Sequence, residues 1–280
     1  MQKQVILDPF QNVVASGVAV CDMNKFLGQT LEKIVLDFAG SGALTRSMLT
    51  LIQLKANGKV IFETTGANIG SSNLYNGQTD DATKLKIDFM DRKAVTVNAR
   101  QVGAIDLSQA SGVANLRLEV TIAGATTPIL SGVADVSPVS ADPAEAGIRP
   151  LVCRRHRATV VIGAAGTFAI PVPHIDPAGG GSNYRRVYCF SANMTALKAV
   201  RDGVTEFELT KAQNQFNQVD NFKSPQASLV VFDPVQDGQL AGRTWDTRQG
   251  VVRSAQFYGT FSAGETITVE TEELITLGMY

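Results

Sequence analysis

The sequence predicts an all-β protein in which one β unit is used twice. Many short strands, separated by turns about every 8 to 12 residues, are typical of antiparallel sandwiches and barrels. A hairpin pattern then occurs twice, with an Asn-Gly pair at 57–58 in the first copy and an Asp-Gly pair at 202–203 in the second. Both pairs favour type I′ turns, because both central residues of that turn need a positive φ.

The match between the two copies continues downstream of the turns. A strand at 85–89 follows the first hairpin, and a strand at 229–233 follows the second at nearly the same distance. The period is 203 minus 58, or 145 residues. That is the length of a domain, whereas solenoid units have about 20 to 50 residues. Chance is the alternative, since Asn-Gly hairpins are common, but the shared spacing favours duplication.

Composition favours a packed protein that meets other proteins. Apolar residues make up 44% of the 280 residues and charged residues only 18%, so much of the surface can be buried against partners. The 25 Lys and Arg residues balance 26 Asp and Glu residues, which gives a net charge of −1. Broad nucleic-acid binding depends on a basic excess that neutralises phosphates, so this class of protein is disfavoured.

The cysteines and histidines do not indicate a metal site or disulfides. Cys21, Cys153 and Cys189 are widely spaced and form no CxxC pair, and the chain has only two histidines. We interpret the cysteines as small buried residues in a reducing compartment, and we expect no zinc site. No apolar run reaches the ~18 residues that a membrane span needs, and the N-terminus lacks the apolar region of a signal peptide.

Turn residues divide the chain into three parts. Residues 1–27 hold short apolar stretches and are expected to form an extended N-terminal arm rather than core. Residues 28–150 form the first unit, which ends in a linker at 137–150 that contains three prolines. Residues 151–280 form the second unit. Within the first unit, we expect the Gly-, Asn- and Ser-rich segment 66–81 to be a loop.

One helix is expected, at 210–220 in the second unit. Thr210 and Gln213 have the spacing of a capping box, in which each side chain bonds a backbone amide near the start of the helix. Apolar residues at helical spacing form a narrow stripe: Leu209, Ala212, Phe216 and Val219. We expect this stripe to be buried against a sheet or a neighbouring unit, which makes Phe216 a candidate interface residue.

The sharpest charge cluster is the basic run at 154–157. Its arginines could contact phosphate or lipid headgroups, or they could pair with carboxylates at a contact between units or subunits. The second interpretation is favoured because the cluster is short and the chain is neutral, so Arg154, Arg155 and Arg157 are candidate interface residues. Four glutamates near the C-terminus could supply the partners or bind Ca²⁺ loosely, although such residues more often form a solvated strand face. They are Glu265, Glu270, Glu272 and Glu273.

The sequence carries little that indicates catalysis. It has no GxGxxG, GxxxxGK[ST], GxSxG, HExxH or EF-hand pattern. His156 lies among arginines, where a surface or interface role is favoured, and His174 follows two prolines in an expected turn. A Ser-His-Asp arrangement built on either histidine has no local support, so we do not expect an enzyme.

Several short stretches carry a family resemblance by their order and spacing. They are residues 28–32, which lead into the first strand, the Arg pair at 154–155, residues 184–186, the second hairpin and the helix at 210–220. In this order they resemble the viral double jelly-roll major capsid proteins, and among these the corticovirus type, from tailless icosahedral phages with a membrane inside the capsid. The resemblance covers most of the chain from about residue 28 onward.

The resemblance implies a fold and a function. The fold would be a double jelly roll, with two tandem eight-stranded jelly rolls and short helices in the connecting loops. The function would be that of a structural major capsid protein, whose homotrimers form pseudo-hexagonal capsomers and tile an icosahedral shell around an internal lipid membrane. Its partners would be its own copies, penton proteins and membrane-associated virion proteins, without direct contact with nucleic acid. The protein would be made in the cytoplasm of a bacterial host, lie in the virion capsid and need no cofactor, with a structural Ca²⁺ ion left open.

Two other classes of function compete with the capsid. One is a two-domain β-sandwich binding module, such as a lectin or a phage spike, which loops rich in Gly, Asn and Asp would support. The other is an enzyme on a jelly-roll scaffold, since a fold does not fix a function. A metal-dependent enzyme of that kind would need several histidines, and the chain has two. Assembly separates the first two classes, because a capsid protein forms trimers and arrays whereas a lectin binds a glycan as a discrete oligomer.

Overall fold

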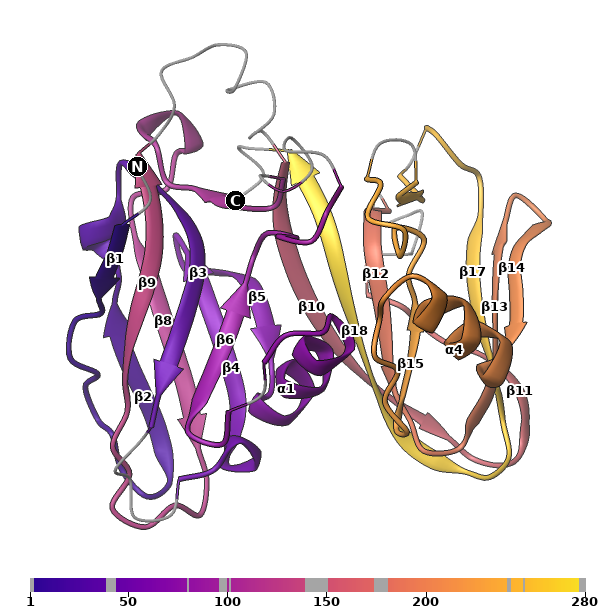
Figure 1. Cartoon of the computed structure of the whole chain (residues 1–280), viewed down its shortest axis with the longest axis horizontal. Coiled ribbons are helices and arrows are strands. Elements are labelled where there is room, and N and C mark those ends of the chain that lie inside the picture. Colours follow the sequence, from indigo (N-terminus) through magenta and orange to yellow (C-terminus); the bar gives the residue numbers. More distant parts are fainter. Residues whose placement is uncertain are drawn as a thin grey trace.

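The computed structural model describes residues 3–38, 44–79, 81–95, 100, 102–138, 151–173, 181–240, 243–248 and 250–276. Strands dominate this part of the chain and form two β sandwiches that stand side by side (Figure 1). Two α-helices among the described residues lie on segments that connect the strands. The prediction of an all-β fold with short helices in the connections is therefore confirmed.

The first sandwich contains the strands from β1 to β9. One of its sheets has the order β1-β9-β3-β6, with β7 paired to β3, and the other has the order β2-β8-β4-β5. The strands are β1 (Lys3–Ile6), β2 (Gly17–Asp22), β3 (Gln29–Asp37), β4 (Leu49–Ala56), β5 (Lys59–Thr64), β6 (Lys84–Asp88), β7 (Ile105–Asp106), β8 (Leu116–Ile122) and β9 (Ser131–Pro138). Helix α1 (Gly66–Tyr75) follows β5, and short 3₁₀ turns lie at Asn24–Phe26, Arg46–Met48 and Gln109–Ser111.

The second sandwich repeats this arrangement with the strands from β10 to β18. Its sheets have the orders β10-β18-β12-β15, with β16 paired to β12, and β11-β17-β13-β14. The strands are β10 (Leu151–Ile162), β11 (Gly166–Ala169), β12 (Asn183–Phe190), β13 (Met194–Arg201), β14 (Val204–Thr210), β15 (Leu229–Phe232), β16 (Trp245–Asp246), β17 (Ala255–Phe261) and β18 (Glu265–Thr276). Helix α4 (Lys211–Asp220) follows β14 as α1 follows β5.

The two halves share their strand order and their irregularities. Each strand of the first half has a counterpart with the same neighbours in the second, and both orders are those of a jelly roll. The register shift between Leu54 and Lys55 in β4 recurs between Ala199 and Val200 in β13, at the spacing of 145 residues. Because a β-bulge inserts one residue at a defined place in a ladder, shared bulges are strong evidence for one unit used twice.

The two hairpin turns have the predicted geometry. Asn57 and Gly58 have φ values of 51° and 80°, and Asp202 and Gly203 have φ values of 50° and 78°. The side-chain oxygens of Asn57 and Asp202 each accept two hydrogen bonds from backbone amides of a neighbouring loop. A type I′ turn and the same side-chain anchor therefore occur in both halves.

Each sandwich encloses its own apolar core. Inward-facing residues alternate along the strands, as in β8, where Leu116, Leu118, Val120 and Ile122 are buried between more exposed neighbours. The second core holds a group of aromatic rings around Phe232, which lies 5.4 Å from the ring of Trp245. Burial of such faces supplies the main stabilisation of each half.

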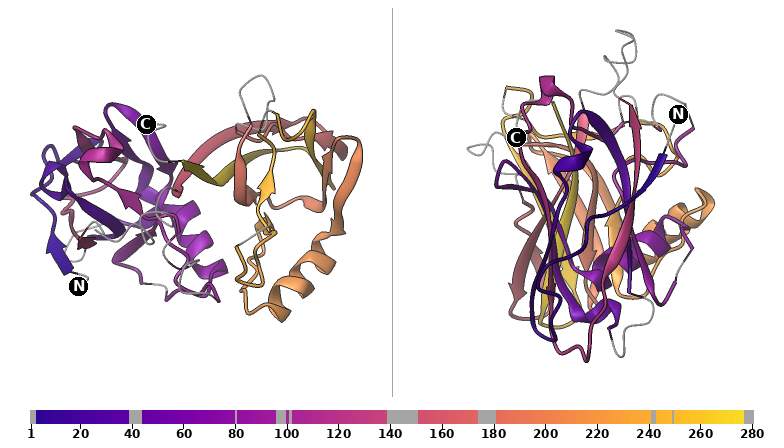
Figure 2. Two further views of the ribbon diagram at one scale, coloured as in Figure 1. Left: turned by 90° about the horizontal axis from the view of Figure 1, so that it is seen from above. Right: turned by 90° about the vertical axis from the view of Figure 1, so that its left-hand side faces the viewer.

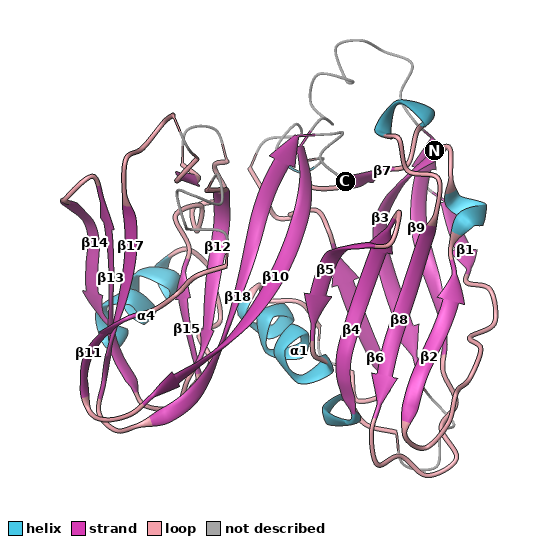
Figure 3. Cartoon of the chain, turned by 180° about the vertical axis from the view of Figure 1, so that it is seen from behind, coloured by secondary structure: helices cyan, strands magenta, loops and turns pink. Residues whose placement is uncertain are grey.

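The two sandwiches are joined in two ways. Strand β5 pairs in parallel with β10 at Phe62 and Arg155, which links sheets of both halves into one nine-stranded sheet. Helix α1 lies between the halves, as the view from behind also shows (Figure 3). The chain crosses from β9 to β10 through residues 139–150, so most of the expected linker lies outside the described residues.

Two expectations need correction. The residues expected to form an N-terminal arm instead supply β1 and β2, which pair with β9 and β8 and bury Ala19, Cys21 and Phe26 in the first core. Their short apolar stretches are strands, because partners far along the chain complete the ladders. The segment expected to be a loop at 66–81 contains α1, where the hydroxyl of Thr65 caps the helix start by accepting from the backbone amide of Asn68.

Candidate assembly site

The candidate site lies where helix α1 of the first jelly roll meets the sheet of the second. Strand β10 places Arg155 under the helix with an exposure of only 2%. Its Nε donates to Glu270 at 2.7 Å, and its Nη2 donates to the hydroxyl of Ser72 on α1 at 2.7 Å. The guanidinium also lies 4.9 Å from the centre of the Tyr188 ring. One buried cation therefore contacts both halves of the chain.

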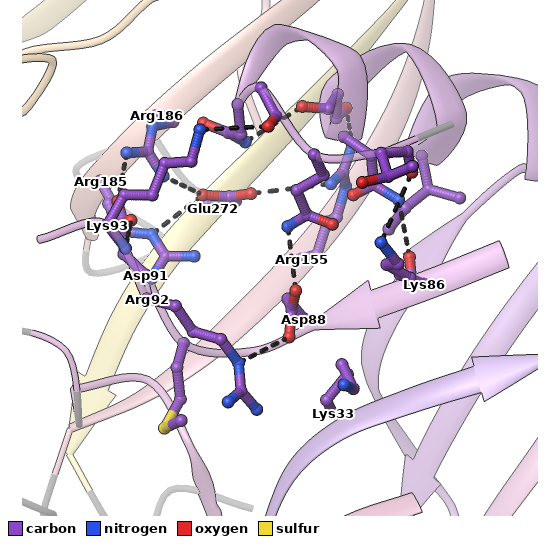
Figure 4. Close-up of a pocket in the computed structure, with 18 residues that line it drawn as sticks. Lys33, Lys86, Asp88, Asp91, Arg92, Lys93, Arg155, Arg185, Arg186 and Glu272 are labelled. Atoms are coloured by element: carbon purple, nitrogen blue, oxygen red, sulfur yellow. Dashed lines mark hydrogen bonds and ion pairs between the residues drawn. The ribbon is translucent and has the colours of Figure 1, made fainter. Parts of the chain in front are cut away.

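Glu272 on β18 is the centre of the charge network. It accepts hydrogen bonds from Nε of Arg185 at 2.9 Å, from Nη1 of Arg186 at 3.2 Å and from the hydroxyl of Tyr188 at 2.9 Å. Nη1 of Arg155 lies 3.7 Å away. Figure 4 shows the three arginines gathered around Glu272, from two strands of the same sheet. A bulge in β12 places the adjacent residues Arg185 and Arg186 so that both reach it.

A second carboxylate, Asp233, extends the network behind Arg186. Nε of Arg186 donates to Asp233 at 2.9 Å, and its Nη2 reaches Asp91 of the first jelly roll at 2.6 Å. The hydroxyl of Tyr75 on α1 donates to Asp233 at 3.0 Å. Nζ of Lys223 lies 3.9 Å from the same carboxylate. Two residues of the first half are thus held by groups of the second half.

The charges of the network balance. Four cations, Arg155, Arg185, Arg186 and Lys223, face four carboxylates, Asp91, Asp233, Glu270 and Glu272. Burial raises the pKa of Glu272, but the three arginines outweigh it and lower that pKa to about 2. Burial and the charge of Arg186 lower the pKa of Lys223 to about 8. Glu272 is therefore ionised at neutral pH.

Beside the network lies a cavity of about 310 Å³ that opens between α1, β6 and the second jelly roll (Figure 4). Its charged lining is mostly basic, with Lys33, Lys86, Arg92, Lys93 and the three arginines against Asp88, Asp91 and Glu272. Most of these groups already have carboxylate partners, as in the 2.7 Å pair of Lys33 with Asp135. Among the described residues, no group of three or more His, Cys, Asp and Glu side chains is placed to hold a metal ion. The arrangement holds two β units together.

The sequence-predicted basic residues have different environments. Arg155 belongs to the network described above, whereas Nη2 of Arg154 lies 3.7 Å from Glu273 on the other face of the strand. Arg157 is half-buried and lies opposite Glu270 in the register of β10 and β18. His174 lies outside the described residues. A contact of these arginines with another subunit stays a prediction.

The glutamates near the C-terminus are not a solvated strand face. Glu270, Glu272 and Glu273 are 0%, 6% and 0% exposed, because α1 and the arginines of β10 and β12 cover them. Sequence reasoning missed Arg185 and Arg186 as members of the site, as well as Asp233. The available signal was the Arg-Arg pair at 185–186 within β12, where an apolar or alternating pattern is expected.

The expected buried stripe of α4 is exposed. Phe216 and Val219 are 74% and 59% exposed, and Phe222 just beyond the helix is 90% exposed. The buried residues are Asn214 and Gln218, whose amide groups both donate to the carbonyl of Val231 at 2.8 Å. Burial of Phe216 against a sheet of its own chain is therefore wrong, because the helix satisfies a backbone carbonyl of β15 with amide side chains and turns its apolar residues outward. Its role at a contact with a neighbouring unit stays a prediction.

Comparisons with known proteins agree with this architecture. The family model for the N-terminal domain of viral coat protein P2 matches residues 4–137, and the model for its C-terminal domain matches residues 152–277. The chain is thus a structural viral coat protein and not an enzyme. It belongs to the viral coat protein P2 family, and its place is in the virion capsid. No curated protein sequence matches the chain.

Solved structures show the same double jelly-roll fold. The major capsid protein P2 of bacteriophage PM2 has a TM-score of 0.84 at 18% identity, with 99% of this chain and 98% of that chain covered. The major capsid protein of Sulfolobus turreted icosahedral virus has a TM-score of 0.69 at 12% identity, with 99% and 97% covered. The PBCV-1 capsid protein has a TM-score of 0.62 at 8% identity, with 98% and 93% covered. The predicted resemblance to the corticovirus type is confirmed.

Proposed function

We propose that the chain forms homotrimers that act as pseudo-hexagonal capsomers of an icosahedral shell. The observation that carries the proposal is the repeated jelly roll, because three chains then supply six similar units. Within one chain the contact between the units is heterologous, since a helix of one unit meets a sheet of the other. A heterologous contact repeated around an axis gives a closed ring when the rotation closes.

The buried charge network would fix the angle between the two jelly rolls of each chain. Charges that are fully paired and buried are costly to separate, because each lost partner leaves an uncompensated charge in a medium of low polarity. A ring of six units closes only if each step has the correct rotation. A rigid joint within the chain supports this, whereas a flexible linker would leave the angle free.

The shell would surround an internal lipid membrane in a virus that infects bacteria. The net charge of −1 supports an inner surface that meets membrane proteins rather than genome, since there is no basic excess to neutralise phosphates. Penton proteins and membrane-associated virion proteins would be the other partners. Three buried thiols and no disulfide among the described residues support synthesis in the reducing cytoplasm of the host. No helix in the described part of the chain has the length and hydropathy to cross a membrane.

Electron microscopy of the purified protein tests this proposal. We expect compact particles with a hexagonal outline and a threefold axis, and planar or curved arrays of these particles at high concentration. Particles with only two lobes, the size of a single chain, would contradict the proposal. So would rings with another number of subunits.

A further inference from the structure

Within one chain, the outer face of sheet β10-β18-β12-β15 covers the preceding helix, α1. Thr64 and Asn68 donate hydrogen bonds to Glu270 at 2.8 and 2.7 Å. The ring of Tyr75 packs edge-on against Tyr188, with centroids 6.2 Å apart. The first jelly roll thus offers a helix, and the second offers the sheet face that receives it.

Helix α4 sits on the second jelly roll as α1 sits on the first. Asn73 of α1 donates to the carbonyl of Lys86 at 2.9 Å, and Gln218 of α4 donates to the carbonyl of Val231 at 2.8 Å. Each residue of the second pair lies 145 positions after its counterpart, since 218 minus 73 equals 231 minus 86. The two helices therefore present corresponding sides to their surroundings.

The side of α4 that corresponds to the covered side of α1 is open. Ser72 and Tyr75 are 2% and 0% exposed, whereas their counterparts Asn217 and Asp220 are half-buried and exposed. Phe216 lies four positions before Asp220 and is therefore its neighbour on the helix surface. Its exposure of 74% shows that the described part of the chain leaves this side without cover.

An equivalent sheet face is available on the first jelly roll. In the second jelly roll, Glu270 lies beside Tyr188 in the row that receives α1. The same register in the first jelly roll places Val133 beside Val35, with Ile6 on its other side. Ile6 is 72% exposed, and the two valines are half-buried. The polar row that receives α1 is therefore replaced by an apolar row.

The charged row next to it is repeated as well. Arg186 and Glu272 face each other in the second jelly roll at 3.2 Å, and Lys33 and Asp135 occupy the corresponding places in the first at 2.7 Å. Both pairs follow the same register shift in their ladders. The first jelly roll therefore keeps the pattern of a face that receives a helix, with apolar side chains at the positions that contact it.

We infer that α4 of one copy docks on the β1-β9-β3-β6 face of a neighbouring copy, so that Phe216 and Phe222 meet Ile6, Val133 and Val35. The inference rests on the proposed trimer and names its contact. The two surfaces match in character, because exposed Phe216 and Phe222 on the helix side and Ile6, Val133 and Val35 in the sheet row are apolar, whereas the contact within the chain is mainly polar. Helix α4 and the β1-β9-β3-β6 sheet also lie on the same side of the molecule (Figure 2). Copies that are joined by such contacts are therefore arranged along a curve, which favours a closed ring over a straight filament.

Site-directed cross-linking tests the contact. Protein with Phe216→Cys is mixed with protein with Ile6→Cys, dissociated and reassembled, and treated with a short bis-maleimide. We expect covalent dimers from the mixture, because the cross-link joins two different copies, and covalent trimers from the double variant, because each copy then gives and receives one link. The native thiols are buried, and burial raises the pKa of each, so wild-type protein is the blank.

A matched control uses Val204→Cys in place of Phe216→Cys. Val204 is 64% exposed, and its counterpart Lys59 is exposed rather than covered by the second jelly roll, so this thiol should not reach Ile6→Cys. The inferred contact is overturned if native mass spectra show trimers but Phe216→Cys and Ile6→Cys do not cross-link. It is also overturned if Val204→Cys cross-links to Ile6→Cys as well as Phe216→Cys does. Either result leaves the trimer itself supported. Protein that remains monomeric overturns both. In a second measurement, Phe216→Asp should shift the assembly to monomers, and trimers of wild-type stability in this variant also overturn the contact.

Discussion

Glu272→Gln removes the central charge of the network between the jelly rolls while keeping the size of the side chain. The variant leaves Arg185, Arg186 and Arg155 with one carboxylate fewer in a site where Glu272 is 6% exposed. Breaking a buried ion pair by removing one partner costs about 3 to 5 kcal/mol. The pKa gives a similar magnitude, because a fall from 4.5 to about 2 corresponds to about 3 kcal/mol in favour of the ionised folded form.

Urea unfolding at fixed protein concentration measures this cost as a loss in the free energy of unfolding. Glu208→Gln is the matched control, because Glu208 is 62% exposed and pairs with Lys198 at 3.3 Å on the surface. We expect the control to cost about 0 to 1 kcal/mol, as exposed ion pairs do. If Glu272→Gln and Glu208→Gln lower the free energy of unfolding by the same small amount, the charge network does not hold the two jelly rolls together.

The pH dependence provides a second check on the same carboxylate. Its folded-state pKa lies below the ordinary value of 4.5, so its contribution to stability is complete above pH 4.5 and is lost as the pH falls toward 2. The difference in unfolding free energy between wild type and Glu272→Gln should therefore shrink across this window. A difference that stays constant from pH 6 to pH 2.5 would refute the assignment of the cost to the ionised form.

Three further outcomes are expected. Gly58→Ala and Gly203→Ala should each cost about 1 to 2 kcal/mol in urea unfolding, because both positions have a positive φ that a side chain disfavours; unequal or negligible costs would argue against equivalent turns. Gln218→Ala should cost about 0.5 to 1.5 kcal/mol, since the carbonyl of Val231 loses one of its two amide donors and keeps Asn214, and a neutral result would contradict the amide-inward orientation of α4. The three native cysteines should react with a thiol reagent only after unfolding, as burial raises the pKa of each to about 11 or 12, and rapid labelling of the native protein would contradict their burial.

Local sequence signals predicted the parts of the fold that depend on local physics. The type I′ turns follow from Asn-Gly and Asp-Gly, and the capping box of Thr210 and Gln213 is present at the start of α4. The duplication was visible because the turn and the strand downstream of it recur at nearly the same spacing. The turn and the cap are each specified within a few residues, so no distant partner is needed to form them.

The missed features depend on distant partners. Helix α1 is rich in Gly, Ser and Asn, which favour loops, and it is covered by the second jelly roll through Ser72 and Tyr75. The outward face of α4 could not be predicted from its spacing, because an apolar stripe does not reveal whether its partner is the same chain or another copy.

The charge network shows the same limit. Arg155 lies 115 positions before Glu270, and each residue alone is typical of a solvated strand face. Only the pairing of β10 with β18, and the helix that covers them, buries both charges. The sequence therefore predicted that the basic cluster pairs with carboxylates, but it could not show that Arg185 and Arg186 dominate the site.

Native mass spectrometry across a concentration series is the most direct test of the proposed capsomer. We expect a species of three 29.8 kDa chains at micromolar concentration, together with a melting temperature that rises with protein concentration because folding and association are coupled. A stable 29.8 kDa monomer whose melting temperature does not depend on concentration would contradict the trimer and favour a discrete binding module.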